Sequence, residues 1–130
     1  GIPYMDGGLA DSIPIEHALE KGNDKIVVVL TRNPGYRKKR ALKATEQLYK
    51  RAYKKYPNLV HAIMTRNAVY NRQMKLIEKL EEEGKIFVIR PLIPTVSRME
   101  KDYDKLQHFY MHGNRLMKKE YQGLLEYLNE

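Results

Sequence analysis

The sequence predicts an α/β protein, part of a layered α/β/α parallel sheet of about three strands with long C-terminal helices. Two apolar runs carry this prediction, residues 25–30 and 85–90, which are rich in β-branched side chains. Uninterrupted apolar runs of this length are typical of strands that are buried on both faces. The segments between and after these runs show helical spacing, and helices are the usual connections between parallel strands.

The first part of the chain predicts a weaker strand and a short helix. The strand is expected near residues 3–5 and the helix over residues 13–21. Ser12 is a suitable N-terminal cap for this helix, and Gly22 is a suitable end.

Three longer helices are predicted, over residues 40–56, 59–83 and 102–128. The first places Thr45, Leu48 and Tyr56 on one face and most of its cations on the other. The second has an apolar stripe from Val60 to Leu80. The third could break near Gly123, and its apolar stripe is expected to consist of Tyr103, Leu106, Tyr110, Gly113, Met117, Tyr121, Leu124 and Leu128.

Composition excludes several classes of protein. The 130 residues suit one domain, and the absence of cysteine excludes disulfides, zinc–thiolate sites, iron–sulfur clusters and cysteine nucleophiles. No apolar run approaches the ~20 residues of a membrane span. The net charge is +8 (24 Lys and Arg minus 16 Asp and Glu), and residues 32–56 hold ten cations against one acid, Glu46. Such a segment indicates an anionic partner.

The stretch Asp6-Gly7-Gly8 is the sharpest candidate site. In parallel sheets, ligands bind beyond the carboxyl ends of the strands, where this acid is expected to lie. Glycines allow positive φ and close backbone approach, so Asp6 could serve as a general base. The alternative is an Asx-turn with no chemical role, because Asp-Gly is a common turn sequence.

A longer stretch, residues 4–30, resembles the C-terminal half of the patatin-like phospholipases. The matching features are the Asp6-Gly7-Gly8 turn, Ile13-Pro14, the helix that ends at Gly22, and the strand that begins at Asp24. The segments 31–39 and 89–106 look like a bacterial subgroup of that family, so the resemblance covers essentially the whole chain.

The resemblance implies a serine acyl hydrolase that acts on lipid or other esters with a Ser–Asp dyad and no cofactor or metal. Asp6 matches the dyad acid, with Gly7 and Gly8 as supporting residues of the motif. Residues 1–95 would be the end of the catalytic core and residues 96–130 a C-terminal helical region.

The nucleophile of that family is missing here. Ser12 and Ser97 are the only serines, and neither lies in Gly-x-Ser-x-Gly. We therefore expect a cytoplasmic enzyme whose nucleophile half precedes Gly1, and a chain that is inactive alone. We also expect it to pair with that half, or with itself, through exposed sheet surface.

The basic segment leaves alternatives open. Arg32, Arg37, Lys38 and Lys39 are candidates for contacts with anionic headgroups at a membrane surface. A nucleic-acid partner is less favoured, because tyrosines at helical spacing are more often core than stacking platforms. The alternative to an enzyme is a non-catalytic basic module that binds nucleic acid or anionic membranes.

A metal site is not expected. Asp104, His108 and His112 recur every four residues, but they lie roughly opposite the predicted apolar stripe of their helix, so we expect them to face water.

Overall fold

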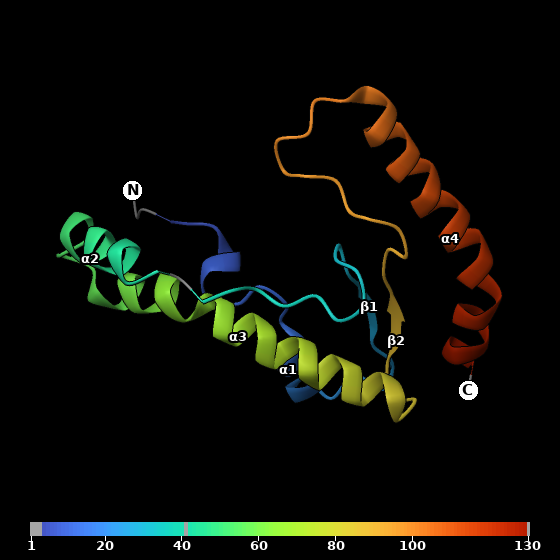
Figure 1. The fold of residues 1–130 in the computed structure, drawn as a ribbon. Coiled ribbons are helices and arrows are strands. Elements are labelled where there is room, and N and C mark those ends of the chain that lie inside the picture. The colour runs from blue at the N-terminus through green and yellow to red at the C-terminus, as the bar shows by residue number, and fades with distance from the viewer. Residues whose placement is uncertain (1–3, 41, 130) are drawn as a thin grey trace. The chain divides into compact units, whose positions relative to one another are not determined.

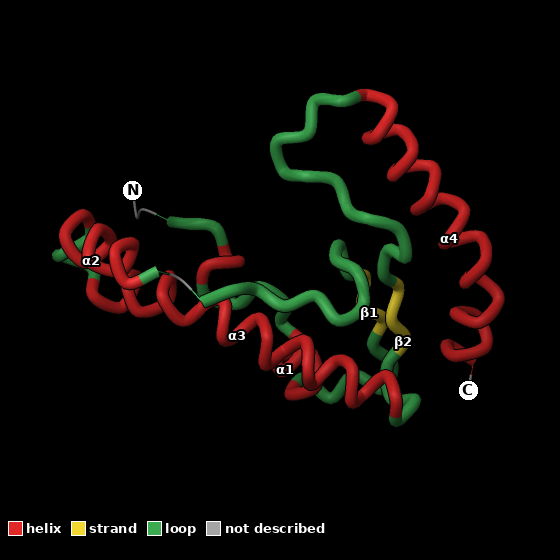
Figure 2. Tube along the Cα trace, viewed as in Figure 1, coloured by secondary structure: helices red, strands yellow, loops and turns green. Residues whose placement is uncertain are grey.

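The computed structural model describes residues 4–40 and 42–129. Its elements follow the order η1 (Gly7–Leu9), α1 (Ile15–Glu20), β1 (Val27–Val29), α2 (Lys43–Ala52), α3 (Pro57–Glu82), β2 (Phe87–Ile89) and α4 (Tyr103–Asn129), as Figures 1 and 2 show. The α/β class and the long C-terminal helix are confirmed. The chain divides into two compact units, Gly1–Asn23 with Arg37–Lys79 and Asp24–Tyr36 with Leu80–Glu130.

The sheet of the second unit has two strands. β1 pairs with β2 in parallel, and Val28 lies opposite Val88. The strands predicted over 25–30 and 85–90 are therefore present, although each is shorter. The strand near 3–5 is wrong for Tyr4 and Met5, which are exposed and pair with no other strand; Pro3 lies outside the described residues. The described residues thus form a two-stranded sheet rather than a layered three-stranded one.

Tyr127 joins α4 to the start of both strands. Its hydroxyl accepts a hydrogen bond from the Ile26 amide at 3.0 Å and lies 3.1 Å from the Lys85 carbonyl oxygen, to which it can donate. Its ring lies against Phe87, with the centroids 5.8 Å apart. A Cβ at Gly123 would meet the Phe87 ring at 3.7 Å, so α4 packs closely on β2 here without a break at this glycine.

The packed face of α4 differs from the predicted stripe. Leu116 is buried, and Phe109, His112 and Tyr127 are half-buried, whereas the predicted stripe is exposed at many of its positions. These exposed positions are Tyr103, Leu106, Tyr110, Gly113, Tyr121 and Leu128. The helix carries apolar residues on two faces. The face that packs on β2 is the one with Gly123, because the Phe87 ring lies close to this small residue.

The first unit packs around α3. Val60, Tyr70, Met74 and Ile77 of α3 are buried, as the predicted stripe requires, together with Ile15 of α1. Two polar contacts join α1 and the residues just before it to this helix. Asp11 accepts a hydrogen bond of 2.5 Å from Gln73, and Glu16 forms an ion pair with Arg72 at 3.4 Å.

The orientation of α2 also departs from the prediction. Leu48 is 66% exposed, whereas Thr45, Glu46 and Tyr49 of the helix and Tyr53 at its C-terminal cap are half-buried. Large tyrosine rings cover more neighbouring surface than a single leucine, so the face with Tyr49 and Tyr53 is the one that is half-covered.

Glycines end two helices as predicted. Gly22 follows α1 with φ 70° and Gly84 follows α3 with φ 69°. At Gly84 the Lys85 amide donates to the Leu80 carbonyl at 2.9 Å, which completes a Schellman motif. The predicted cap of α1 is wrong: Pro14 occupies the cap position, and the Ser12 hydroxyl instead donates to the Gly8 carbonyl at 2.9 Å.

Candidate functional site

The turn at Asp6 is built from its own side chain. Oδ1 of Asp6 accepts a hydrogen bond from the Gly8 amide at 2.6 Å, and the Leu9 amide donates to the Asp6 carbonyl at 3.1 Å. A Cβ at Gly8 would lie 2.8 Å from Oδ1, so any larger residue would push the amide and the carboxylate apart. Neither Gly7 nor Gly8 has positive φ, contrary to the prediction. Gly8 is needed for close approach instead.

Asp6 is exposed to solvent and follows an extended loop rather than a strand. Among the residues that the structure describes, no donor binds its second oxygen, Oδ2. This is the geometry of an Asx-turn, and it also leaves one carboxylate oxygen oriented and open. Asp6 belongs to the first unit, whereas β1 and β2 belong to the second.

Three of the four predicted headgroup contacts are engaged within the chain. Arg37 forms a fork with Glu78, with nitrogen–oxygen distances of 3.0 and 2.5 Å, and this bond raises the pKa of the arginine above its ordinary value. Lys38 lies over the Tyr70 ring at 4.0 Å.

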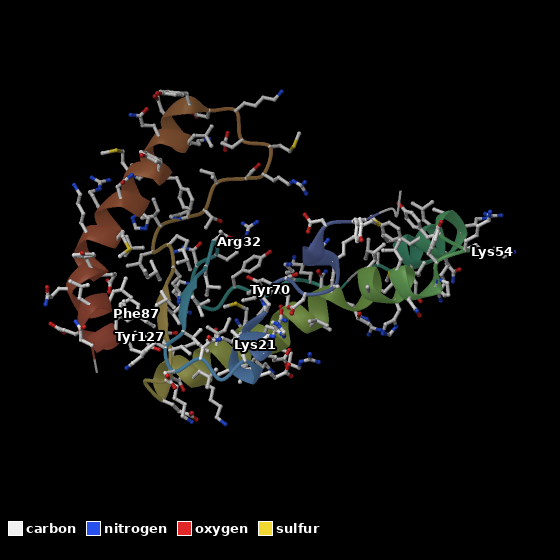
Figure 3. The ribbon with its side chains drawn as sticks, turned by 180° about the vertical axis from the view of Figure 1, so that it is seen from behind. Lys21, Arg32, Lys54, Tyr70, Phe87 and Tyr127 are labelled. Atoms are coloured by element: carbon white, nitrogen blue, oxygen red, sulfur yellow. The ribbon has the colours of Figure 1, made fainter. Side chains whose placement is uncertain are left out.

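The other two of the four differ from each other. Arg32, which Figure 3 labels, lies in the second unit. It donates to Thr95 at 3.0 Å and lies over the Tyr36 ring. The remaining cation, Lys39, is exposed.

Asparagines of α3 hold the backbone of this basic segment. Asn71 accepts a hydrogen bond from the Lys38 amide and donates to the Lys38 carbonyl, both at 2.9 Å. Asn67 donates to the Lys39 carbonyl at 2.7 Å. The sequence analysis missed these contacts. Their one signal is that Asn67, Asn71 and Glu78 are spaced by four and seven residues, which places them on one side of a helix.

A second group of cations is exposed around α2, and we call it the α2 basic surface. It consists of Lys39, Arg40, Lys50, Arg51, Lys54 and Lys55. Glu46, the one acid of this stretch, forms an ion pair with Lys50 at 2.7 Å. The sequence analysis counted these cations, but of them it assigned only Lys39 to headgroup binding, together with Arg32, Arg37 and Lys38 outside this surface.

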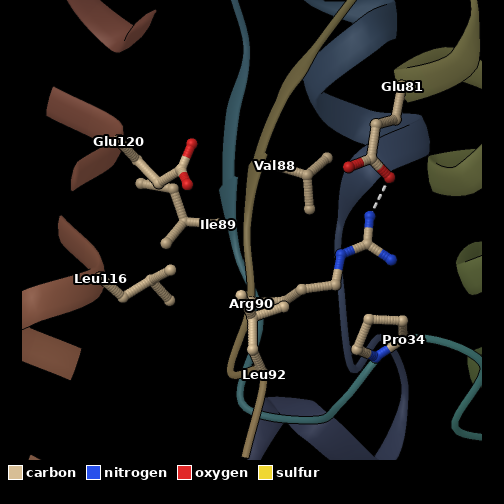
Figure 4. Close-up of a pocket in the computed structure, with 8 residues that line it drawn as sticks. All are labelled: Pro34, Glu81, Val88, Ile89, Arg90, Leu92, Leu116 and Glu120. Atoms are coloured by element: carbon tan, nitrogen blue, oxygen red, sulfur yellow. Dashed lines mark hydrogen bonds and ion pairs between the residues drawn. The ribbon is translucent and has the colours of Figure 1, made fainter. Parts of the chain in front are cut away.

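A cavity of about 350 Å³ in the second unit lies beside β2 (Figure 4). Apolar side chains make up much of its lining, including Ile89 and Leu116, and Arg90 pairs with Glu81 at its wall. The Arg90 side chain is only 10% exposed, so this pair ties β2 to the end of α3. Among the described residues that line it there is no serine, cysteine, histidine or lysine, so the cavity holds no hydroxyl or thiol for the expected acyl transfer.

Asp104, His108 and His112 of α4 do not share one environment. Asp104 and His108 are exposed, as expected, but Nε2 of His112 accepts a hydrogen bond of 3.1 Å from the Leu92 amide, so His112 does not simply face water. Over residues 4–40 and 42–129, no three acids or histidines gather as metal ligands. Within the same residues, no helix has both the length and the hydropathy to cross a membrane.

Comparison with known proteins gives one match. Residues 56–129 match a domain of unknown function, DUF6363, which covers more than half of the chain and runs through α3, β2 and α4. Asp6 and the four predicted headgroup cations lie before the matched residues. No curated protein and no solved structure matches. On the matched residues, the chain belongs to the DUF6363 family.

Proposed function

We propose that this chain is the C-terminal portion of a cytoplasmic serine acyl hydrolase that cleaves lipid or related esters. Asp6 supplies the acid of a Ser–Asp dyad, and the serine, in a Gly-x-Ser-x-Gly turn, belongs to a segment outside these residues. The observation that carries the proposal is the Asp6 carboxylate, which the Gly8 amide holds through Oδ1 at 2.6 Å while Oδ2 has no hydrogen-bond donor among residues 4–40 and 42–129.

A carboxylate held in this way suits proton transfer. Oδ2 takes the hydroxyl proton while the serine oxygen attacks the ester carbonyl, and it then returns the proton to the leaving alkoxide. Water repeats the sequence on the acyl-serine, with Asp6 again accepting and returning one proton. The Gly8 hydrogen bond keeps the carboxylate oriented through both halves of the reaction.

The open edge of β1 also supports the proposal. Cross-strand bonds from Phe87 to Ile26 and from Leu30 to Ile89 direct the peptide groups of alternate residues toward β2. The peptide groups of Val27 and Val29 therefore point the other way. Sheets usually contain ~4–6 strands, so two strands make a narrow sheet. A further strand of the same domain would form hydrogen bonds with the outward peptide groups of β1.

The coding sequence upstream of Gly1 gives the first test. We expect an in-frame Gly-x-Ser-x-Gly, and the longer polypeptide should hydrolyse a short-chain nitrophenyl ester. Asp6→Asn should lower kcat by at least ~10³-fold, because the general base is lost. Asp24→Asn, which changes another exposed aspartate, should leave kcat unchanged.

Two results would contradict the proposal: equal activity of the Asp6→Asn variant, or hydrolysis by residues 1–130 alone that Asp6→Asn abolishes. The second would show that a nucleophile lies within this chain. A start codon at Gly1 would favour the non-catalytic basic module, for which the α2 basic surface is the supporting observation.

A further inference from the structure

We propose that the α2 basic surface is the face by which this protein docks on a bilayer containing anionic lipids. The inference rests on the proposed function for its purpose, which is to bring the enzyme to lipid esters. Its evidence is independent of Asp6 and comes from the charge, exposure and packing of α2 and the residues around it.

The charge of this face is nearly all of one sign. Residues 39–56 contain seven cations and one acid, a net charge of +6. Lys39, Arg40, Arg51, Lys54 and Lys55 are exposed, and Lys54 extends away from the end of α2 (Figure 3). Clusters of this size on an amphipathic helix are attracted to the negative potential of phosphatidylserine and phosphoinositide surfaces.

An apolar side chain lies among these cations. Leu48 shares one hollow of the surface with Lys50, Arg51 and Lys54. It is 66% exposed, and Leu42, just before the helix, is 74% exposed. Leucines beside lysines suit the boundary between headgroups and acyl chains, where the apolar side chain enters the bilayer and the cations stay with the phosphates.

The aromatic residues favour lipid over nucleic acid as the partner. Tyr49 and Tyr53 stack on each other with centroids 6.2 Å apart, and both are half-buried. The Tyr70 ring is covered by Lys38. A single-stranded nucleic acid would need such rings free for its bases. Beside its charges this face leaves Leu42 and Leu48 exposed, together with the ring of Tyr56, which is 56% exposed and, within the described part of the chain, is not stacked on Tyr49 or Tyr53.

Two cations that precede this surface have a structural role instead. Arg37 is bound by Glu78 and Lys38 lies over Tyr70, so both help to fix the segment that leads to α2. Docking is therefore assigned to the exposed set and not to these two, which gives the proposal a residue-level prediction.

Co-sedimentation of the whole chain with vesicles tests it. Vesicles of phosphatidylcholine with phosphatidylserine should bind the chain, and pure phosphatidylcholine vesicles should not. The variant K50E/R51E/K54E/K55E should partition at least tenfold more weakly. The matched control K101E/R115E/K118E/K119E reverses four exposed cations of the other unit and should stay within twofold of the wild type. Far-UV circular dichroism checks that both variants fold.

Leu48→Ser separates the two kinds of partner, because it keeps every charge. Vesicle binding should fall several-fold, and binding to a single-stranded oligonucleotide should not change. The proposal is overturned if the wild type ignores phosphatidylserine, if the control variant loses binding equally, or if only the oligonucleotide binds.

The docking surface and the proposed activity can fail separately. The α2 variant of the longer polypeptide should still hydrolyse a water-soluble ester. If no polypeptide hydrolyses the ester but phosphatidylserine binding persists, the enzyme proposal fails and the docking surface stands.

Discussion

At the scale of single residues, Tyr127 combines hydrogen-bond, ring and cation contacts in the second unit. Its hydroxyl meets the backbone at Ile26 and Lys85, its ring meets Phe87, and Lys25 lies over the ring at 4.6 Å. One side chain of α4 thereby links the beginnings of both strands.

Tyr127→Phe should lower the free energy of unfolding by about 1 kcal/mol, because the Ile26 amide and the Lys85 carbonyl lose a partner while the ring contacts remain. Urea denaturation measures this change. Tyr121→Phe, on an exposed tyrosine of the same helix, is the matched control and should leave the midpoint unchanged. An equal effect of both variants would contradict the assigned contacts.

Residue contacts were the least predictable level. For Asp6-Gly7-Gly8 the sequence left open a catalytic acid or a simple Asx-turn, and the Gly8 bond has the geometry of the Asx-turn. It gave no sign that Gln73 is 1% exposed or that Asn71 pairs with the Lys38 backbone. Such partners are distant in the chain, so local spacing does not contain them. Whether Asp6 transfers protons stays a prediction.

At the scale of elements, periodicity predicted all four α-helices and two of three strands. It failed on which faces of α2 and α4 are packed. Both helices carry apolar residues on more than one side, so the neighbouring element determines which face is packed. For α4, that neighbour is β2, whose Phe87 ring lies against Gly123. Only α3, whose stripe from Val60 to Leu80 is continuous, was oriented correctly.

The start of α4 has a pH-dependent cap. Oδ1 of Asp102 accepts hydrogen bonds from the Asp104 and Lys105 amides at 3.0 and 3.2 Å. The Lys105 amide bond, with the nearby Lys105 charge, lowers the pKa of Asp102 below its ordinary value of 3.8. A carboxyl group whose pKa is lower in the folded than in the unfolded state stabilises the fold at pH values above its unfolded-state pKa. This stabilisation is lost as the pH falls through the folded-state pKa.

Asp102→Ala should therefore lower the thermal midpoint at pH 7, because the first turn of α4 loses its cap. The difference from wild type should shrink as the pH falls from about 4 through the lowered pKa. Asp104→Ala, in the same turn but without these bonds, should have the smaller effect. Circular dichroism at 222 nm follows both, and a difference that persists undiminished in strong acid would refute the cap.

At the scale of the whole molecule, the number of strands was the main error. A parallel sheet of three strands requires a partner for residues 3–5, and Tyr4 and Met5 have none. β1 keeps an open edge, and Val29 is 70% exposed beside it. The division into two units was not foreseen either, because the units alternate along the chain: Asp24–Tyr36 of the second unit separates the two segments of the first.

The open edge predicts self-association at high concentration. Val29→Lys should shift the chain toward monomer, because a lysine on an edge strand opposes pairing with another edge. Leu92→Lys adds the same charge at another exposed apolar residue outside the strands and should have little effect. Analytical ultracentrifugation measures both, and a wild type that stays monomeric at millimolar concentration would contradict the prediction.

The asparagine contacts to residues 38 and 39 have a thermodynamic consequence. A chain of consecutive like charges would otherwise sample many conformations and would lose that freedom on meeting a counter-charge. Because Asn67 and Asn71 already hold the backbone, the segment is preorganised, and much of this entropic cost is met during folding. Lys39 should therefore meet its counter-ion at a smaller entropic cost than the same residue in a disordered polybasic tail.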